Sequence, residues 1–416
     1  MFKVSNSTYS LIATAFVLMV VLGYALFTAI ILPVASDVKV SSHLATYPYR
    51  GLMLVLSLFL IISEPNQSKG CSTNKISRGF VLFMFVYFIR ILIDIYVRNV
   101  YVDPYFRISV VQYMFLIMIP SIIAAYKCGI YVDIAKLNKW LCIGSLAYLL
   151  ITLTVSRSLI QVNYSSEQRV DANVALNTIS FGSMFSSVSI IFLLTLILER
   201  RKRYISVILL VSFLVSFILL LRIGSRGPLV AIIISLLVYL YARQKHSFGG
   251  LAIVSIAILI LYINFDYIMT LISRISPVMG NRMAATIMEN DSSGRDALYA
   301  NAIDIFWQNP ILGKQFVVDI GFYSHNLFLD ALIGLGIGGG IALLYFIVKS
   351  ISKLQNASKV NDSLTILGLL VVKEIVGACF SGALCTNCTL CVLMIVLLSH
   401  DLVMNEEYTQ LEVNNV

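Results

Sequence analysis

The sequence predicts an all-α integral membrane protein with about twelve transmembrane helices and one long outer loop. Of its 416 residues, 59% are hydrophobic and only 12% are charged. Soluble domains contain about half apolar and about a quarter charged residues, so this composition excludes an ordinary soluble globular fold. We expect one polytopic membrane domain over residues 1–416. The first apolar run, from about Tyr9, is long for a signal peptide, and we expect it to remain as the first span.

Twelve segments are candidates for the transmembrane helices. A span needs roughly 20 mostly apolar residues. The second candidate and the last two are short or closely spaced, but the others approach this length. The predicted ranges are 10–33, 50–63, 79–97, 108–126, 139–156, 176–198, 204–221, 228–242, 250–270, 326–348, 363–384 and 387–404.

The distribution of basic residues predicts the orientation. If loops alternate from an inner N-terminus, the inner segments hold eleven lysines and five arginines, whereas the outer loops hold only Lys39 and Lys314 but ten arginines. Short cytoplasmic loops carry the excess of lysine and arginine, so the lysines predict that both termini are cytoplasmic. Single outer arginines can be interfacial side chains. Together they suggest an anionic ligand on the outer side, because the guanidinium group suits phosphate.

Residues 271–324 form the long outer loop, and loops of this length are usually functional. Within it, the segment SSGRDALYANAIDIFW predicts an amphipathic helix along the membrane surface, with Leu298, Ala302 and Ile305 on one side. Ser292 or Ser293 can cap its start, and the Asn-Pro that follows ends it.

A short outer turn, residues 221–228, joins two predicted spans. Ser225 is a plausible N-cap and Pro228 suits a first turn, so a helix should begin here. Its N-terminus offers free N–H groups and the positive end of the helix dipole. Arg222 and Arg226 add positive charge, with no acidic residue in the segment. We predict an anion site; the alternative is a tight turn with two interfacial arginines.

His325, in the sequence Tyr-Ser-His-Asn ahead of the tenth span, is the candidate general base. Imidazole commonly serves as a base near neutral pH, and the long loop should bring it near the outer arginines. The alternative is an interfacial histidine without a chemical role.

Two pairs of charged residues lie inside predicted spans. Arg90 and Asp94 are four positions apart, so an internal salt bridge is expected. Lys373 and Glu374 are adjacent and are expected to point in different directions, either along a proton path or towards other helices.

Two further patterns are weaker. Cys385, Cys388 and Cys391 have a metal-like spacing but lack a second pair of ligands, so we expect no metal there. The glycines at 336 and 338–340 lie inside a span, where they should serve close helix contact.

Three motifs, in order, resemble the O-antigen polymerase and ligase superfamily, and within it the O-antigen polymerase (Wzy) family. They are IGSRGPLVA, SGRDALYANAIDIFWQNPILG and SHNLFLDALIGLGIGGG. In that family an outer Ser-Arg-Gly opens a span, a periplasmic loop carries Gly-Arg before a helix with Trp and Asn-Pro, and a His-Asn is followed by glycines. The match covers roughly residues 220–345, together with the chain's size and number of spans.

The resemblance implies a GT-C-like glycosyltransferase of the bacterial inner membrane. Its substrate would be an oligosaccharide repeat on undecaprenyl pyrophosphate, used at the periplasmic face without metal or cofactor. Arg226 and Arg295 would hold the pyrophosphate with help from Arg222, and His325 would act on the acceptor hydroxyl. Asn326 and Ser225 are weaker candidates for substrate binding. Membrane lipids and a chain-length regulator are the implied partners, and no nucleic acid is expected.

The chain departs from the family pattern at two positions. Gly339 stands before Gly340, where the ligases have Ser or Thr before Gly, which favours polymerase over ligase. Gly334 lies near where the family commonly has a glutamate, so no role that rests on that acid is transferred. The predicted reaction is an inverting displacement that lengthens the saccharide. A ligase that transfers polysaccharide to lipid A-core, and a flippase or exporter of lipid-linked sugars, are the alternatives.

Overall fold

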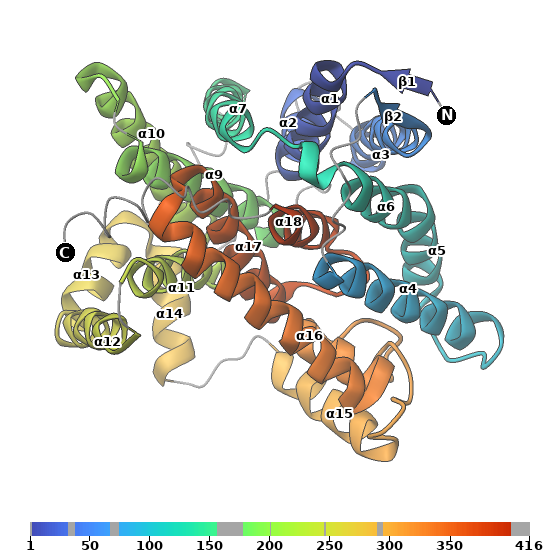
Figure 1. The fold of residues 1–416 in the computed structure, drawn as a ribbon. Coiled ribbons are helices and arrows are strands. Elements are labelled where there is room, and N and C mark those ends of the chain that lie inside the picture. The colour runs from blue at the N-terminus through green and yellow to red at the C-terminus, as the bar shows by residue number, and fades with distance from the viewer. Residues whose placement is uncertain are drawn as a thin grey trace.

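The computed structural model describes residues 2–31, 38–66, 75–155, 178–199, 201–244, 247–288 and 294–400. These residues form helices packed around a buried apolar core (Figure 1). The helices of the first half are α1 (Asn6–Leu18), the π-helical turn η1 (Met19–Gly23), α2 (Tyr24–Ile31), α3 (Val38–Ile62), α4 (Lys75–Tyr96), α5 (Pro104–Tyr113), the π-helical turn η2 (Met114–Met118), α6 (Ile119–Cys128), the 3-10 turn η3 (Gly129–Tyr131), α7 (Ile134–Val155) and α9 (Thr178–Leu198).

The second half of the chain is also helical. It contains α10 (Arg203–Ile223), α11 (Arg226–Ala242), α12 (Ser247–Ile263), α13 (Phe265–Ile275), α14 (Pro277–Met288), α15 (Arg295–Gln308), α16 (Leu327–Val360), α17 (Asp362–Ser381) and α18 (Cys388–Ser399). Two three-residue strands, β1 (Phe2–Val4) and β2 (Ser63–Pro65), pair in parallel. This small strand pair was not predicted.

The helices are those of an α-helical membrane protein. Within the described part of the chain, eight helices are long and apolar enough to cross a membrane. Helices α12 and α13, which are bent by 64° at Asn264, make a ninth candidate if they count as one span. Three further apolar helices are shorter than a full span. Each of the twelve predicted segments coincides with a helix of one of these groups. Large apolar side chains cover the outside of α12, including Ile256, Leu259 and Ile260, as expected of a helix that faces lipid rather than water.

The connecting segments contact one another in two separate groups. In the first group, β1 pairs with β2, and the Lys127 ammonium donates to the carbonyl oxygens of Ile61 at 2.6 Å and Ser63 at 3.0 Å. The Ser358 hydroxyl donates to the carbonyl of Ala242 at 2.6 Å. All these contacts lie between segments that the lysine pattern assigns to the inner side.

The second group joins segments that the same pattern assigns to the outer side. The N–H of Asp103 donates to the carbonyl of Gly321 at 3.1 Å, and the N–H of Leu384 donates to the Asp330 carboxylate at 3.1 Å. The Arg226 side chain donates to the carbonyl of Arg282 at 3.1 Å. Three outer loops and the turn before α11 are therefore tied together on one side of the fold.

Helix α16 is interrupted at Gly336, where the loop before the helix lies against it. Gly336 has φ 68° and ψ −162°, and a Cβ atom placed there would lie 2.2 Å from the carbonyl oxygen of Ile311. The N–H of Ile337 donates to the carbonyl of Pro310 at 2.8 Å. The expectation of close helix contact is wrong for Gly336, because its close neighbour is loop backbone rather than a second helix.

The predicted amphipathic helix is α15, which packs against the first part of α16 (Figure 1). Ala302 and Ile305 are fully buried against Ile333, with Leu298 beside them, so the predicted apolar side is confirmed. The helix begins one residue after Gly294, which has φ 76°. The capping residues predicted for it, Ser292 and Ser293, lie outside the described residues.

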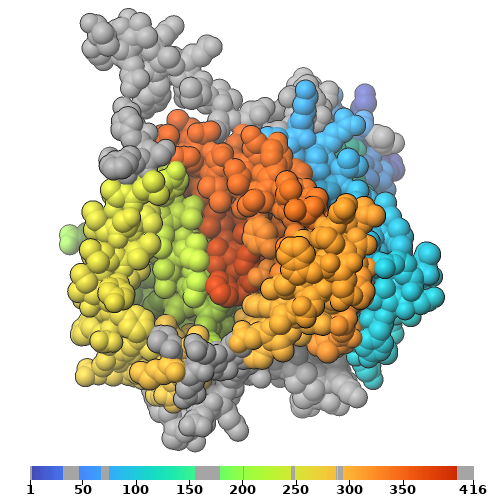
Figure 2. Space-filling model, turned by 90° about the horizontal axis from the view of Figure 1, so that it is seen from below, coloured from blue at the N-terminus to red at the C-terminus, as the bar shows by residue number. Residues whose placement is uncertain are grey.

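The predicted long loop, 271–324, contains the end of α13, all of α14 and α15, and the irregular segment after α15. Seen from below in the space-filling view, the fold is hollowed between α11–α14 on one side and α15 on the other (Figure 2). The residues coloured red at the end of α17 lie at the floor of this hollow.

Candidate active site

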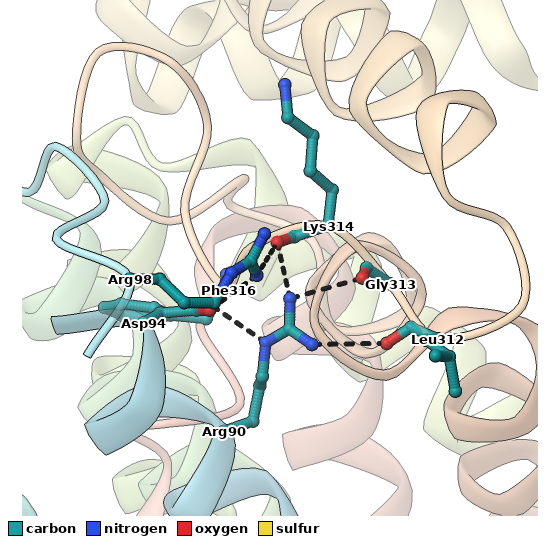
Figure 3. A network of polar contacts seen from close by, with 7 residues as sticks. All are labelled: Arg90, Asp94, Arg98, Leu312, Gly313, Lys314 and Phe316. Atoms are coloured by element: carbon teal, nitrogen blue, oxygen red, sulfur yellow. Dashed lines mark hydrogen bonds and ion pairs between the residues drawn. The ribbon is translucent and has the colours of Figure 1, made fainter. Parts of the chain in front are cut away.

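The loop that carries His325 is anchored by a charged network on α4 (Figure 3). Asp94 is fully buried and accepts from Arg90 Nε at 3.0 Å, from Arg98 Nη1 at 2.9 Å, and from the N–H of Phe316 at 2.9 Å. Arg90 also donates to the carbonyl oxygens of Leu312, Gly313 and Lys314. The predicted Arg90–Asp94 salt bridge is confirmed. Both of its side chains also bind the backbone of the predicted long loop.

A second buried carboxylate holds the part of the loop next to His325. Asp330, fully buried in the first turn of α16, accepts from the Ser324 N–H at 3.0 Å and the Ser324 hydroxyl at 2.7 Å. Its other oxygen accepts from the N–H of Leu384 at 3.1 Å. Asp330 therefore joins the residue before His325 to the segment that follows α17.

Asn326 begins α16 and contacts α17. Its side-chain oxygen accepts from the N–H groups of Phe328 at 2.9 Å and Leu329 at 3.2 Å, which makes it the N-cap. Its side-chain nitrogen donates to the carbonyl of Cys379 at 3.1 Å. Because both polar atoms are used within the protein, the structure places Asn326 as a residue that positions His325.

His325 lies between Ser324, which Asp330 holds, and Asn326, which contacts Cys379. Its backbone conformation is strained. Its φ is 61°, a value that residues other than glycine adopt rarely and that often marks functional sites. Its imidazole lies 4.3 Å from the ring of Tyr323, centroid to centroid. Among the described residues, the buried Nδ1 atom of His325 has no hydrogen-bond partner.

The protonation of His325 is set by burial and by a neighbouring charge. Burial lowers the pKa of the imidazole from its ordinary value, and the Arg295 guanidinium lowers it further, while a hydrogen bond with the backbone of Ser381 opposes both. The imidazole is therefore neutral at pH 7. A neutral imidazole is suited to accept a proton.

Ser381, the last residue of α17, is where the separate motifs meet. Arg295 donates to the Ser381 hydroxyl at 2.8 Å, and His325 contacts the Ser381 backbone. The first turn of α11 packs on the same place, since a Cβ atom on Gly227 would lie 3.2 Å from Phe380 Cβ and 3.9 Å from the Ser381 hydroxyl. Sequence reasoning missed Ser381, because a serine at the end of an apolar span belongs to no recognisable motif.

The turn that was predicted to bind an anion is present, and arginine side chains from both partners join it to α14. Helix α11 begins at Arg226, as predicted, with Ser225 at the N-cap position. The Ser225 side chain makes no capping bond, so that detail of the prediction is wrong; it is buried instead against Gly182. Arg226 donates to the carbonyl of Arg282, and Arg282 donates to the carbonyl of Gly224.

Arg222 lies in the last turn of α10, on the other side of Gly224. The structure therefore brings His325, Arg295 and Asn326 together directly at the end of α17. Arg222, Ser225 and Arg226 adjoin them through the short backbone segment 224–227. Four arginines, counting Arg282, lie in the segments next to the start of α11, an arrangement suited to an anion.

Lys373 and Glu374, two turns inside the fold from Ser381, form a buried ion pair with 2.8 Å between Nζ and Oε1. The expectation that they point in different directions is wrong, because both side chains are long enough to bend towards each other. Lys373 also donates to the hydroxyls of Ser183 at 3.0 Å and Ser187 at 2.8 Å. The pair borders a cavity of about 230 Å³ that reaches Ser381.

Within the described part of the chain, no three His, Cys, Asp or Glu side chains gather so that they could hold a metal ion. Cys385, Cys388 and Cys391 are buried free thiols. Comparison with protein-family models, with curated proteins and with solved structures finds no match for this chain.

Proposed function

We propose that this protein is an O-antigen polymerase of the bacterial inner membrane. It joins oligosaccharide repeats carried on undecaprenyl pyrophosphate, at the periplasmic face, by metal-independent inverting glycosyl transfer. The observation that carries this proposal is the meeting of Arg295 and neutral His325 at Ser381, beside the arginine-rich start of α11. A cation for an anionic leaving group and a base for a hydroxyl are the two elements that such a transfer needs.

The contacts between connecting segments support twelve crossings with both termini in the cytoplasm. The apolar part of α3 (Thr46–Ile62), α11 and α18 are short, and α12 is bent, so length alone does not give the count. If α3, α11 or the bent α12 failed to cross, the assignment of every later segment would be reversed. The contacts would then join segments on opposite faces. Instead, the inner contacts and the outer contacts each join segments that alternate correctly. The end of α18 lies at the segment 127–138, which is assigned to the inner side, because a Cβ atom on Gly129 would lie 3.1 Å from the Ser399 hydroxyl. This topology puts His325 and Arg295 on the periplasmic side, within a GT-C-like architecture.

The chemistry follows from the positions of the charged groups. The arginines neutralise the pyrophosphate, which makes it a better leaving group. The acceptor hydroxyl donates its proton to the neutral imidazole of His325, and its oxygen attacks the anomeric carbon from the side opposite the pyrophosphate. The bond between that carbon and the pyrophosphate oxygen breaks, and undecaprenyl pyrophosphate leaves with the bonding electron pair. Direct displacement inverts the anomeric carbon.

The test uses purified protein in lipid with the undecaprenyl-pyrophosphate-linked repeat unit as the only substrate. A polymerase produces a ladder of longer saccharides, each with an inverted linkage. A product that forms only after lipid A-core is added would replace the proposal with a ligase. Movement of the intact substrate across the bilayer, without any new glycosidic bond, would replace it with a flippase or exporter.

A further inference from the structure

We infer that the cavity beside Lys373 and Glu374 binds the first sugar of the lipid-linked donor, and that Glu374 helps to select that sugar. This inference rests on the proposed function. The cavity, of about 230 Å³, lies between α9, α11, α17 and the start of α18.

The position of the cavity fits a sugar attached to the pyrophosphate. Ser381 borders the cavity and also binds Arg295, so the cavity adjoins the proposed anion site directly. Lys373 lies eight residues before Ser381 on the same helix, about 12 Å deeper along its axis at about 1.5 Å per residue. A sugar at the Ser381 end of this cavity would have its anomeric carbon close to the residues that hold the pyrophosphate, with its far side turned towards Lys373 and Glu374.

The chemistry of the lining fits a neutral, hydroxyl-rich ligand. Lys373 and Glu374 neutralise each other, so the cavity does not attract a second anion. Hydroxyl and amide groups line part of the rest of the wall, among them Ser180, Thr386 and Asn387, beside apolar residues such as Met184 and Ala231. Groups of this kind hydrogen-bond to the hydroxyls of a sugar, whereas an apolar lipid chain would leave them unsatisfied.

Glu374 is the group in this wall best placed to distinguish one sugar from another. Lys373 is saturated, because its three donors bind Ser183, Ser187 and Glu374. The described contacts of Glu374 use only Oε1, which leaves Oε2 to accept from a sugar hydroxyl. Such a charge-assisted bond discriminates strongly, because the site rejects a ligand that lacks the donor.

A ridge of serines on α9 supports the pair. Ser180, Ser183 and Ser187 follow one another at intervals of three and four, so they lie on one face of the helix. This face turns towards α17, where two of the serines hold Lys373. The ammonium group is thereby fixed, and it in turn orients the Glu374 carboxylate.

Binding of lipids to the full chain in nanodiscs tests the inference. The probes are undecaprenyl pyrophosphate alone and the same lipid carrying glucose, galactose, N-acetylglucosamine or N-acetylgalactosamine. We expect at least one sugar to bind wild-type protein about tenfold more tightly than the bare lipid, a difference of about 1.4 kcal/mol. Glu374→Gln should abolish this advantage and leave the affinity for the bare lipid unchanged.

A second variant tests the cavity without breaking the ion pair. Gly377 lines the cavity, and a Cβ atom there meets nothing within 4 Å, so Gly377→Leu extends its side chain from an open position into the cavity. The matched control is Gly338→Leu, because Gly338 is also helical and also open but lies outside the cavity. Gly377→Leu should lose the sugar advantage, and Gly338→Leu should keep it.

The outcomes separate the two proposals. If wild-type protein binds the bare lipid but no sugar adds affinity, or if Glu374→Gln and Gly377→Leu both keep the advantage, the inference is overturned and the proposed function stands. If wild-type protein binds neither the bare lipid nor any sugar-bearing lipid, the proposed function fails, and the inference fails with it.

Discussion

Replacing Asp94 with alanine removes the carboxylate that holds the outer loop onto α4. The Asp94 side chain is 0% exposed and that of Arg90 is 15% exposed, so their ion pair is buried. Removal of one partner of a buried pair costs about 3–5 kcal/mol, because the other charge is left without compensation. Arg98 is 41% exposed, and its contact with Asp94 adds at most about 1 kcal/mol. The bond from the Phe316 N–H is lost as well.

Hydrogen–deuterium exchange measures this change where it acts. A loss of about 3 kcal/mol in the free energy of local opening should speed exchange of the amides of residues 312–316 at least about 100-fold. Activity should fall in parallel, because the same loop carries His325. The control is Asp133→Asn, since Asp133 and Lys136 form an exposed pair at 3.7 Å. Unchanged exchange over 312–316 in Asp94→Ala would refute the reasoning that this network anchors the loop.

Three further predictions concern the site and the break in α16. Arg226→Lys should lower turnover about tenfold or more in the saccharide-ladder assay although charge is kept, because lysine lacks the forked donor; near-normal turnover would show that bulk charge suffices. Because the pKa of His325 is lowered, its neutral form should persist, and activity with it, as the pH falls below about 6.5. Arg295→Gln removes one cause of the lowering, so the acidic limb of its residual pH–rate profile should move to higher pH; a limb that does not move would contradict this assignment. Gly336→Ala should lower stability by about 1–3 kcal/mol from backbone strain alone, measured as a fall in Tm, whereas Gly338→Ala should not; equal Tm values would contradict the account of the break.

The helices could be predicted from the sequence because each span is a local property. A window of about 20 apolar residues can be recognised from its own composition, without reference to the rest of the chain. Every predicted window coincides with a helix. The pairing of β1 with β2 could not be predicted in this way. A strand of three residues is too short to show a hydrophobic periodicity, and β2 lies about sixty positions from β1 in the sequence.

The candidate site was predictable in part. The residues that stand in motifs, His325 and Arg295, lie together in the fold. The residues that bring them together have no motif, because Ser381 is 86 positions from Arg295 and is recognisable only once α17 is placed beside α15. The role of Asp330 was likewise not predicted, although this buried carboxylate fixes Ser324 and therefore the position of His325.

The directions of the Lys373 and Glu374 side chains were predicted wrongly for a physical reason. Adjacent helical residues have Cα–Cβ bonds that diverge by about 100°, so short side chains would indeed separate. Lysine and glutamate are long and flexible, and in a buried setting the two charges stabilise each other more than separation would.

The most direct measurement of the central claim is the saccharide ladder made by wild-type protein, by His325→Ala and by His400→Ala from the undecaprenyl-pyrophosphate-linked repeat unit alone. His400 follows α18 at the end far from the site, so its replacement controls for the loss of a histidine. We expect a ladder from the wild type and from His400→Ala, and none from folded His325→Ala. A full ladder from His325→Ala, or no ladder from folded wild-type protein, would contradict the account.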